Sequence, residues 1–310
     1  MTHHSRPSTQ EHYVAPFDDV TSFEELKDAP PPAKFKLTFM GKIGAVVVTF
    51  WVLIALLGPF IAPLGENELP FPDAYSEFQA PQPGAWLGTD VDDRDVLSRL
   101  MFGASRTLGI AFAATIIAYF FGVILGIGAI VAGPKVDLVV SRINDAFMSL
   151  PTIMLGLVVV AAVGSSIPIL ILTAGFIYTT VVFRLARGIG MDIIVMDYVE
   201  AAKVRGDGIW WIVTREIWPN AAMPLISDFG LRLIIVILFI SSLGFLGLGV
   251  QPPQADWGSM VRENLGALQY GESYLPVIAP AVAIATLTVG INLVVDDISS
   301  HAGRKLSGRM

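Results

Sequence analysis

The chain of 310 residues is 54% hydrophobic and only 15% charged, with a mean hydropathy of +0.64. A soluble domain carries charge on about a quarter of its residues, so this composition indicates a membrane protein. The formal net charge of -7 argues against a nucleic-acid partner, because phosphate binding requires clustered Lys and Arg. The chain has no Cys, which excludes disulfides and thiolate metal sites.

The N-terminal segment, residues 1–41, combines Ser, His, acidic residues and Pro with few periodic apolar positions. Such a segment buries too little apolar surface to form a core, so we predict a mobile tail. The first apolar run begins too far from the start, and is too long, for the hydrophobic region of a cleavable signal peptide.

Five long runs without ionisable residues follow, and a helix needs roughly 20 apolar residues to cross the hydrocarbon layer. Four runs fit one helix each. The fifth, 146–183, is too long for one span, and Gly164 and Pro168 near its middle are typical of a turn. The sequence therefore predicts an all-α membrane protein with six transmembrane helices within residues 42–298. The four single-helix runs are 43–65, 107–134, 233–255 and 273–295.

Lys and Arg are unevenly distributed among the connecting segments. They are frequent in the N-terminal tail, in 184–224 and in the C-terminal tail 299–310, whereas 66–106 is rich in Asp and Glu. Cytoplasmic loops near helix ends carry excess positive charge. We therefore predict that both termini and 184–224 are cytoplasmic, and that 66–106 and 251–272 face outward.

The segment 184–224 contains the sequence DYVEAAKVRG, which begins at Asp197. It resembles the EAA loop of ABC importer permeases. In that family the loop forms a short coupling helix that docks in a groove of the cytoplasmic ATPase subunit. Small side chains permit close approach of a partner, and charges can pair at the rim of an interface. The residues of these two kinds are Glu200, Ala201, Ala202, Lys203 and Arg205.

Two residues of the same segment have a backbone role in this interpretation. Gly206 can adopt the positive φ that ends one helix and redirects the chain, and Pro219 ends the next helix or opens the following one. The alternative is a solvated helix-turn-helix that only connects two spans. Spacing alone does not decide between these alternatives.

Two further regions resemble the C-type subunit of the dipeptide, oligopeptide and nickel permease family. One reads LGTD at 87–90, RDVLSRL at 94–100 and GASR at 103–106. The other reads SLGFLGLGVQPP at 242–253, followed by WGSM at 257–260. These two regions and the EAA-like loop occur along the chain in the same order as in that family. The chain departs from the family's usual residues at Asp93, Glu216 and 295–297.

The outward segment contains four charged residues shortly before the second span, Asp90, Arg94, Asp95 and Arg99. This mixture is typical of an amphipathic external helix. These residues either contact a docked substrate-binding protein or lie on the membrane surface and pair with one another. The second region contains three glycines, and two interpretations of them are open. They either allow a neighbouring helix to pack closely or act as flexible points at a gate of the transport pathway; the residues are Gly244, Gly247 and Gly249.

The predicted spans contain no ionisable residue near their centres, which disfavours proton- or sodium-coupled transport. The chain also lacks the Gly-x-x-x-x-Gly-Lys-Ser/Thr loop that cradles nucleotide phosphates, so we expect no ATP site in it. An ion-coupled secondary carrier and a non-transporting membrane scaffold remain as alternatives to an importer permease.

The resemblance implies the fold of type I ABC importer permeases and a place in the bacterial inner membrane. It also implies a second permease subunit, two ATPase subunits that bind ATP and Mg²⁺, and an extracytoplasmic substrate-binding protein. No cofactor is expected in this chain. The transported solutes would be dipeptides, oligopeptides or related small molecules.

Overall fold

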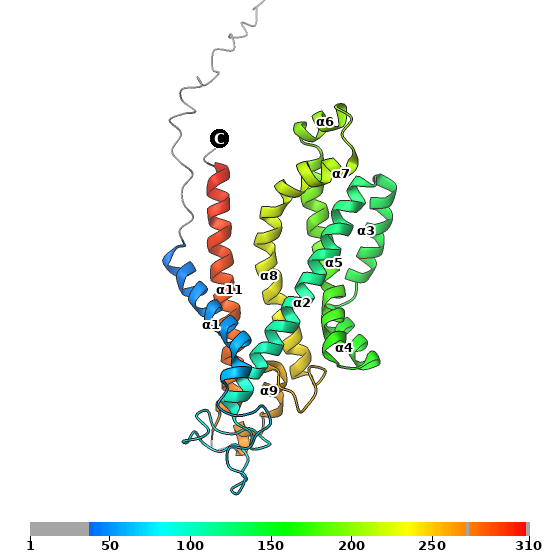
Figure 1. Ribbon diagram of the computed structural model, residues 1–310. Helices are drawn as coiled ribbons and strands as arrows, with labels where there is room; N and C mark the ends of the chain where they lie inside the picture. The colour runs from blue at the N-terminus through cyan, green and yellow to red at the C-terminus, as the bar shows by residue number, and fades with distance from the viewer. Residues whose placement is uncertain (1–36, 271–272, 308–310) are drawn as a thin grey trace, which may run out of the picture. The chain divides into compact units, whose positions relative to one another are not determined.

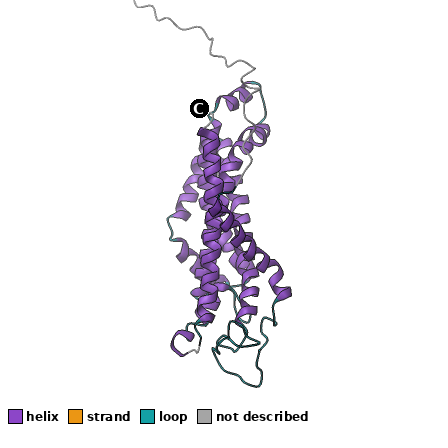
Figure 2. Ribbon diagram, turned by 90° about the vertical axis from the view of Figure 1, so that its left-hand side faces the viewer, coloured by secondary structure: helices purple, strands orange, loops and turns teal. Residues whose placement is uncertain are grey.

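The computed structural model describes residues 37–270 and 273–307, and regular secondary structure in those ranges is helical (Figures 1 and 2). Most of the predicted N-terminal tail lies outside the described residues. The elements in chain order are α1 (Phe39–Ile61), α2 (Val96–Val131), α3 (Pro134–Met148), α4 (Thr152–Val163), α5 (Ile167–Ile194), α6 (Asp197–Val204), α7 (Ile209–Trp211), the π-helix η1 (Ile212–Ile217), α8 (Trp218–Phe245), α9 (Trp257–Glu263), α10 (Ala267–Tyr270) and α11 (Leu275–Ser307).

Five helices of the described chain are long and apolar enough to cross a membrane. They are α1, α2, α5, α11 and the continuous segment Ile209–Phe245, which comprises α7, η1 and α8. A sixth span exists if the bent pair α3 and α4 counts as one crossing. The predicted all-helical membrane fold is confirmed.

The long apolar run 146–183 does break where the sequence predicted, because α4 ends at Val163 and α5 begins at Ile167. Gly164 between them has φ +109, a conformation that favours Gly. The structure adds a second break that the sequence analysis missed. Helices α3 and α4 meet at an angle of 82°, so the chain bends sharply between Met148 and Thr152.

Two spans begin earlier than the charge-free runs suggested. Helix α2 begins at Val96, so Arg99 and Arg106 belong to the membrane helix itself and the separate amphipathic external helix is not observed. Helix α8 begins at Trp218, which places Asp228 and Arg232 inside it. Both charged residues precede the charge-free run 233–255, so α8 extends beyond the predicted span at its N-terminal end.

Small residues allow the spans to approach one another closely. A side-chain carbon added to Gly122 would lie 2.6 Å from Val182 Cβ, and one added to Gly126 would lie 2.7 Å from the carbonyl oxygen of Phe183. Helices α2 and α5 therefore pack backbone to backbone along much of their length. Between membrane helices, where lipid is as apolar as the side chains, such close packing is a main source of association.

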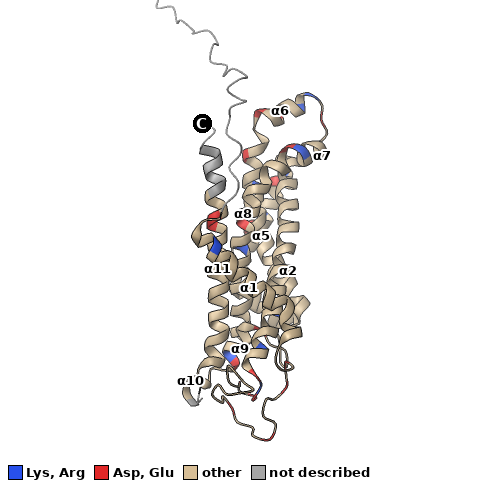
Figure 3. Cartoon of the chain, turned by 60° about the vertical axis from the view of Figure 1, so that its left-hand side comes forward, with Lys and Arg blue, Asp and Glu red and all other residues tan. Residues whose placement is uncertain are grey.

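Helix α6 and the C-terminal end of α11 lie at one end of the bundle, while the segment 62–95, α9 and α10 lie at the other (Figure 1). Most charged side chains gather at these two ends, and the middle of the helices carries few of them (Figure 3). The N-cap residue of α1, Thr38, donates its backbone N–H to Asp297 of α11 at 3.0 Å. The start of α1 is thus on the side of the bundle toward which α11 ends.

Candidate functional site

Helix α6 ends in a complete glycine cap. The N–H of Gly206 donates to the carbonyl of Lys203 at 3.0 Å, and the N–H of Asp207 donates to that of Ala202 at 3.1 Å. This pair of bonds is the Schellman arrangement, which requires a left-handed residue directly after the helix. Gly206 fills that position with φ +85, as the sequence predicted.

One face of α6 packs into the subunit and the other is exposed. Val199 and Ala202 are fully buried, whereas Glu200, Ala201 and Lys203 are exposed. Three- and four-residue spacing places Val199 and Ala202 on one side of the helix. Of the two alanines proposed to permit close approach of a partner, only Ala201 is therefore available at the surface.

Arg205 is engaged within its own loop. Its guanidinium lies 2.9 Å from a carboxylate oxygen of Asp207 and 5.6 Å from the ring centroid of Trp211. Both partners are local, and the side chain remains more than half exposed. Arg205 therefore stiffens the turn after α6, and its charge remains accessible at the end of the bundle.

The end of the bundle around α6 exposes several large apolar side chains. Val204 is 83% exposed, Val195 is 73% exposed and Tyr198 is 40% exposed. An apolar patch with charged neighbours at its edge is typical of a surface that binds another protein. Glu200 and Lys203 supply such charges on α6 itself.

Pro219 lies in the first turn of α8, directly after the π-helix η1. Proline has no amide N–H to donate, and π-helical turns occur mostly as single interruptions within longer helices. Pro224 is a second interruption inside α8. The connection between α6 and the membrane part of α8 therefore contains two places where regular α-helical bonding is broken.

At the opposite end, the four charged residues of the outward segment are buried. Asp90 and Arg99 are each 1% exposed, Asp95 is 2% exposed and Arg94 is 7% exposed. A single carboxylate oxygen of Asp90 lies 2.9 Å from Nε of Arg94 and 3.0 Å from Nε of Arg99. Of the two alternatives that the sequence left open, the structure favours pairing within the chain.

This ion-pair network joins the outward segment to α9. Glu263 lies 3.5 Å from Arg99 and 3.8 Å from Arg94, and Arg99 also donates to the carbonyl of Pro253 at 3.1 Å. Burial raises the pKa of the Glu263 carboxyl, although the two arginines oppose the shift. The network thus fixes segments that are far apart in the sequence.

Two aspartates cap helices at this end. Asp95 accepts the Ser98 N–H at 2.8 Å at the start of α2, and Asp256 accepts the N–H groups of Gly258 and Ser259 at the start of α9. Asp256 is fully buried, and this burial raises the pKa of its carboxyl. Asp95 therefore serves as a helix cap, and the structure gives its side chain no outward-facing role.

Two glycines in the segment 242–253, at the end of α8, are positions of close packing. A side-chain carbon on Gly244 would lie 2.7 Å from Oδ1 of Asp256, and one on Gly249 would lie 2.4 Å from Cα of Gly244. Gly247 instead has φ +89 after the end of α8. The chain folds back on itself here so closely that side chains would prevent it.

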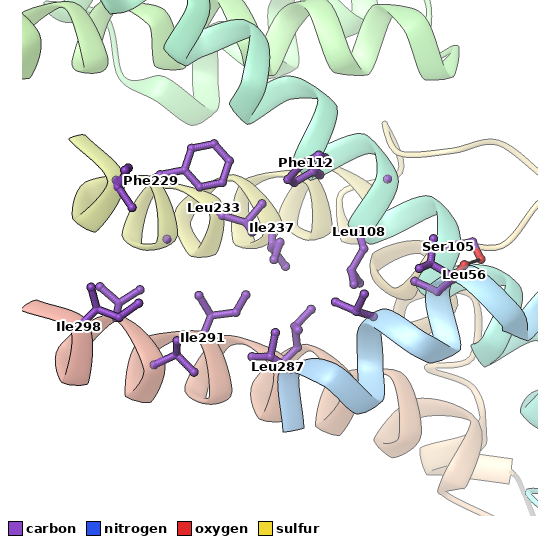
Figure 4. A pocket seen from close by; sticks show the side chains of 18 residues that line it. Leu56, Ser105, Leu108, Phe112, Phe229, Leu233, Ile237, Leu287, Ile291 and Ile298 are labelled. Carbon is purple, nitrogen blue, oxygen red and sulfur yellow. Dashed lines mark hydrogen bonds between the residues drawn. The ribbon is translucent and has the colours of Figure 1, made fainter. Parts of the chain in front are cut away.

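An apolar cavity of about 510 Å³ lies between α1, α2, α8 and α11 (Figure 4). Its wall includes Phe112 of α2, Phe229 of α8 and Ile291 of α11. Ser105, a polar residue of the wall, donates its hydroxyl to the carbonyl of Ala55. The lining is thus suited to hydrocarbon.

Comparison with known proteins identifies the class of the molecule. A family model described as the binding-protein-dependent transport system inner membrane component matches residues 118–307. The chain belongs to this family. It is the membrane permease subunit of an ABC importer, as the resemblance of the sequence indicated.

Curated relatives cover most of the chain. A dipeptide transport system permease protein of Alkalihalophilus pseudofirmus is 28% identical over 97% of this chain and 94% of its own length. A probable D,D-dipeptide transport system permease protein of Escherichia coli K12 is 31% identical, with 86% and 87% covered. A glutathione transport system permease protein of Pectobacterium atrosepticum is 28% identical, with 89% and 92% covered.

Sequence reasoning missed one polar cluster between two spans, formed by Tyr119, Asp228 and Arg232. Asp228 and Arg232 are four residues apart, the spacing of helical neighbours, and this signal was present in the sequence. The sequence did not show that α2 supplies Tyr119 as the partner of Asp228, because the two residues are 109 positions apart. Among the described residues, no cluster of His, Cys, Asp and Glu is arranged to hold a metal ion.

Proposed function

We propose that this permease subunit moves dipeptides, oligopeptides or related small solutes into the cytoplasm. The names of the relatives support this substrate class, because the three described above are permeases for dipeptides, D,D-dipeptides and glutathione. The polar residues of the spans are mainly Ser and Thr. A pathway without a fixed net charge is compatible with peptides of mixed side chains.

ATP hydrolysis would take place in two partner ATPase subunits, one of which would dock on α6. The observation that supports this docking is the exposed apolar patch around α6, with Val204 and Val195 largely uncovered beside Glu200 and Lys203. Ala201 would permit close contact and Arg205 would remain at the rim. Gly206 and Pro219 would determine the orientation of α6 relative to α8.

The outward network has a supporting role in this proposal. The network would hold the segment 62–95 in the conformation that a substrate-binding protein contacts. Its own members would not touch that protein; they are Asp90, Arg94, Asp95 and Arg99. A buried ion-pair network specifies one arrangement of the segments that it joins, because moving either segment would leave a buried charge without its partner. A second permease subunit would complete the pathway.

Reconstitution tests the proposal. The isolated subunit should hydrolyse no ATP, whereas the complex with its ATPases should do so, faster after addition of the peptide-loaded binding protein. Proteoliposomes should then accumulate labelled dipeptide only with ATP. Uptake that survives without ATP and depends on a proton gradient would contradict the proposal, as would stable complexes that move no solute.

A further inference from the structure

A polar cluster joins α2 to α8 just before the charge-free run 233–255 of α8. The hydroxyl of Tyr119 donates to Oδ2 of Asp228 at 2.5 Å. Nη2 of Arg232 donates to both oxygens of the same carboxylate, at 3.0 and 3.2 Å. The bond from Tyr119 is the one that crosses between helices, because Asp228 and Arg232 both belong to α8.

The surroundings of the cluster are apolar. The ring of Phe229 packs edge-on against Tyr119 at 5.0 Å and against Phe112 at 6.1 Å. Phe112 and Phe229 also line the cavity between the spans (Figure 4). The side chains of Asp228 and Arg232 are 18% and 13% exposed. Charged groups buried to this extent need partners that offset the loss of water, so their pairing restricts how α2 and α8 pack.

The cluster lies well inside both helices. Asp228 is 10 residues after Trp218, or about 15 Å along α8, and Tyr119 is 12 residues before Val131, or about 18 Å along α2. The Nε atom of Arg232 is buried and has no hydrogen-bond partner among the described residues. The cluster is therefore incompletely satisfied in this conformation, which is unfavourable in an apolar environment.

Helix α8 is interrupted between α6 and the cluster, but not beyond it. The π-helix η1 and Pro224 both precede Asp228, while the rest of α8 to Phe245 contains no Pro. A displacement of α6 can bend the chain at those two places. Asp228 is therefore placed where the bending part of α8 meets its regular part.

Helix α2 extends from this contact to the outward end. It is one continuous helix from Val96 to Val131, contains no Pro, and carries Arg99 of the outward network near its start. From Tyr119 to Arg99 the distance along the helix is 20 residues, or about 30 Å. A rotation of α2 at Tyr119 would thus reach the segment that the outward network holds.

We propose that the Tyr119 hydroxyl is a positioning group that fixes α8 against α2 through Asp228 and transmits movement of α6 to the outward end. This inference rests on the proposed docking of ATPases at α6. Tyr119 touches neither nucleotide nor solute in this role. Its loss should uncouple hydrolysis from transport while the complex remains assembled.

The test compares Tyr119→Phe with Tyr178→Phe in the reconstituted complex with its ATPases and binding protein. Tyr178 is a matched control, because it is a buried tyrosine of a neighbouring span whose ring packs against Phe239 at 5.5 Å. Tyr119→Phe retains the ring beside Phe229 and removes only the hydroxyl. The readout is the number of ATP molecules hydrolysed per dipeptide taken up.

We expect Tyr119→Phe to raise this ratio several-fold with unchanged amounts of assembled complex, and Tyr178→Phe to leave it unchanged. In an Asp228→Ala background, Tyr119→Phe should add little, because the acceptor of the Tyr119 hydroxyl is already absent. Should Asp228→Ala lower the amount of complex in the membrane, the comparison of Tyr119→Phe with Tyr178→Phe still decides.

Equal ratios for Tyr119→Phe and Tyr178→Phe would overturn the inference. So would additive effects of Tyr119→Phe and Asp228→Ala in complexes that assemble normally. Failure of the proposed function is recognised separately, because in that case the wild-type complex itself would show no ATPase stimulation by loaded binding protein and no ATP-dependent uptake.

Discussion

The Nε atom of Arg99 lies 3.0 Å from a carboxylate oxygen of Asp90, and both residues are 1% exposed. This pair connects α2 to the outward segment that precedes it, at a place where water is excluded. The sequence left open whether these charges contact a binding protein or pair with one another, and the structure buries both within the subunit. The outward end is therefore an ordered part of the fold.

Removal of Arg99 should destabilise the subunit strongly. Arg99→Gln leaves the buried Asp90 with Arg94 as its remaining cation, and breaking a buried ion pair from one side costs about 3–5 kcal/mol. The measurement is the midpoint of thermal unfolding of the detergent-purified complex. Arg184→Gln is the control, because the Arg184–Asp145 pair is exposed on both sides and should contribute less than about 1 kcal/mol. Equal midpoints for the two variants would contradict a stabilising role of the network.

Replacement of Gly206 should disturb α6 through the backbone alone. No atom lies within 4 Å of an added side-chain carbon, but φ is +85, so Gly206→Val strains the helix cap by on the order of 1 kcal/mol or more. We expect normal membrane insertion, weaker co-purification of the ATPases and loss of dipeptide uptake.

Gly208→Val is the matched control for this change. Gly208 also has open space around it, but its φ of -68 suits any residue. If both variants assemble and transport like the wild type, the precise orientation of α6 is unimportant for coupling.

Gly249→Ala should lower stability by overpacking. The new carbon would lie 2.4 Å from Cα of Gly244, so the backbone has to shift, at a typical cost of about 1–3 kcal/mol. Gly128→Ala provides the contrast, because nothing lies within 4 Å at that helical position and alanine there is favoured by about 0.5–1 kcal/mol. Thermal midpoints of the purified complex should shift in opposite directions. An unchanged midpoint for Gly249→Ala would favour a flexible gate at this turn.

The orientation of the chain can be tested by thiol labelling. The sequence contains no Cys, so single cysteines introduced at Ser76 and Lys203, both exposed, give unambiguous signals. We expect an impermeant reagent to label Ser76→Cys in intact cells and Lys203→Cys only after the membrane is opened. The reverse pattern would invert the topology that the distribution of Lys and Arg predicts.

Local signals in the sequence predicted local structure well. Gly164 and Pro168 indicated the break between α4 and α5, and Gly206 indicated the end of α6. In each case the reason is a backbone preference of the residue itself, which needs no partner. Family membership was also evident from the spacing of short motifs along the chain.

Burial of individual side chains could not be predicted in the same way. Ala202 and Ala201 are adjacent and chemically identical, yet one is buried against the subunit and the other is exposed. The start of α2 at Val96 was missed because Arg106 was taken as the end of the apolar run. In the structure Arg106 pairs with Glu66, and the helix continues through it.

The sequence by itself determined that this protein is helical, resides in a membrane and belongs with importer permeases, because apolar run lengths and motif order are properties of the chain alone. Only the tertiary structure decided which charges are satisfied internally. Arg99 pairs with Glu263, and Tyr119 with Asp228, across intervals of more than 100 residues, and such pairings depend on how the helices pack. Whether a polar group is a surface contact or an internal one depends on those distant partners, since an unpaired buried charge is too costly to persist.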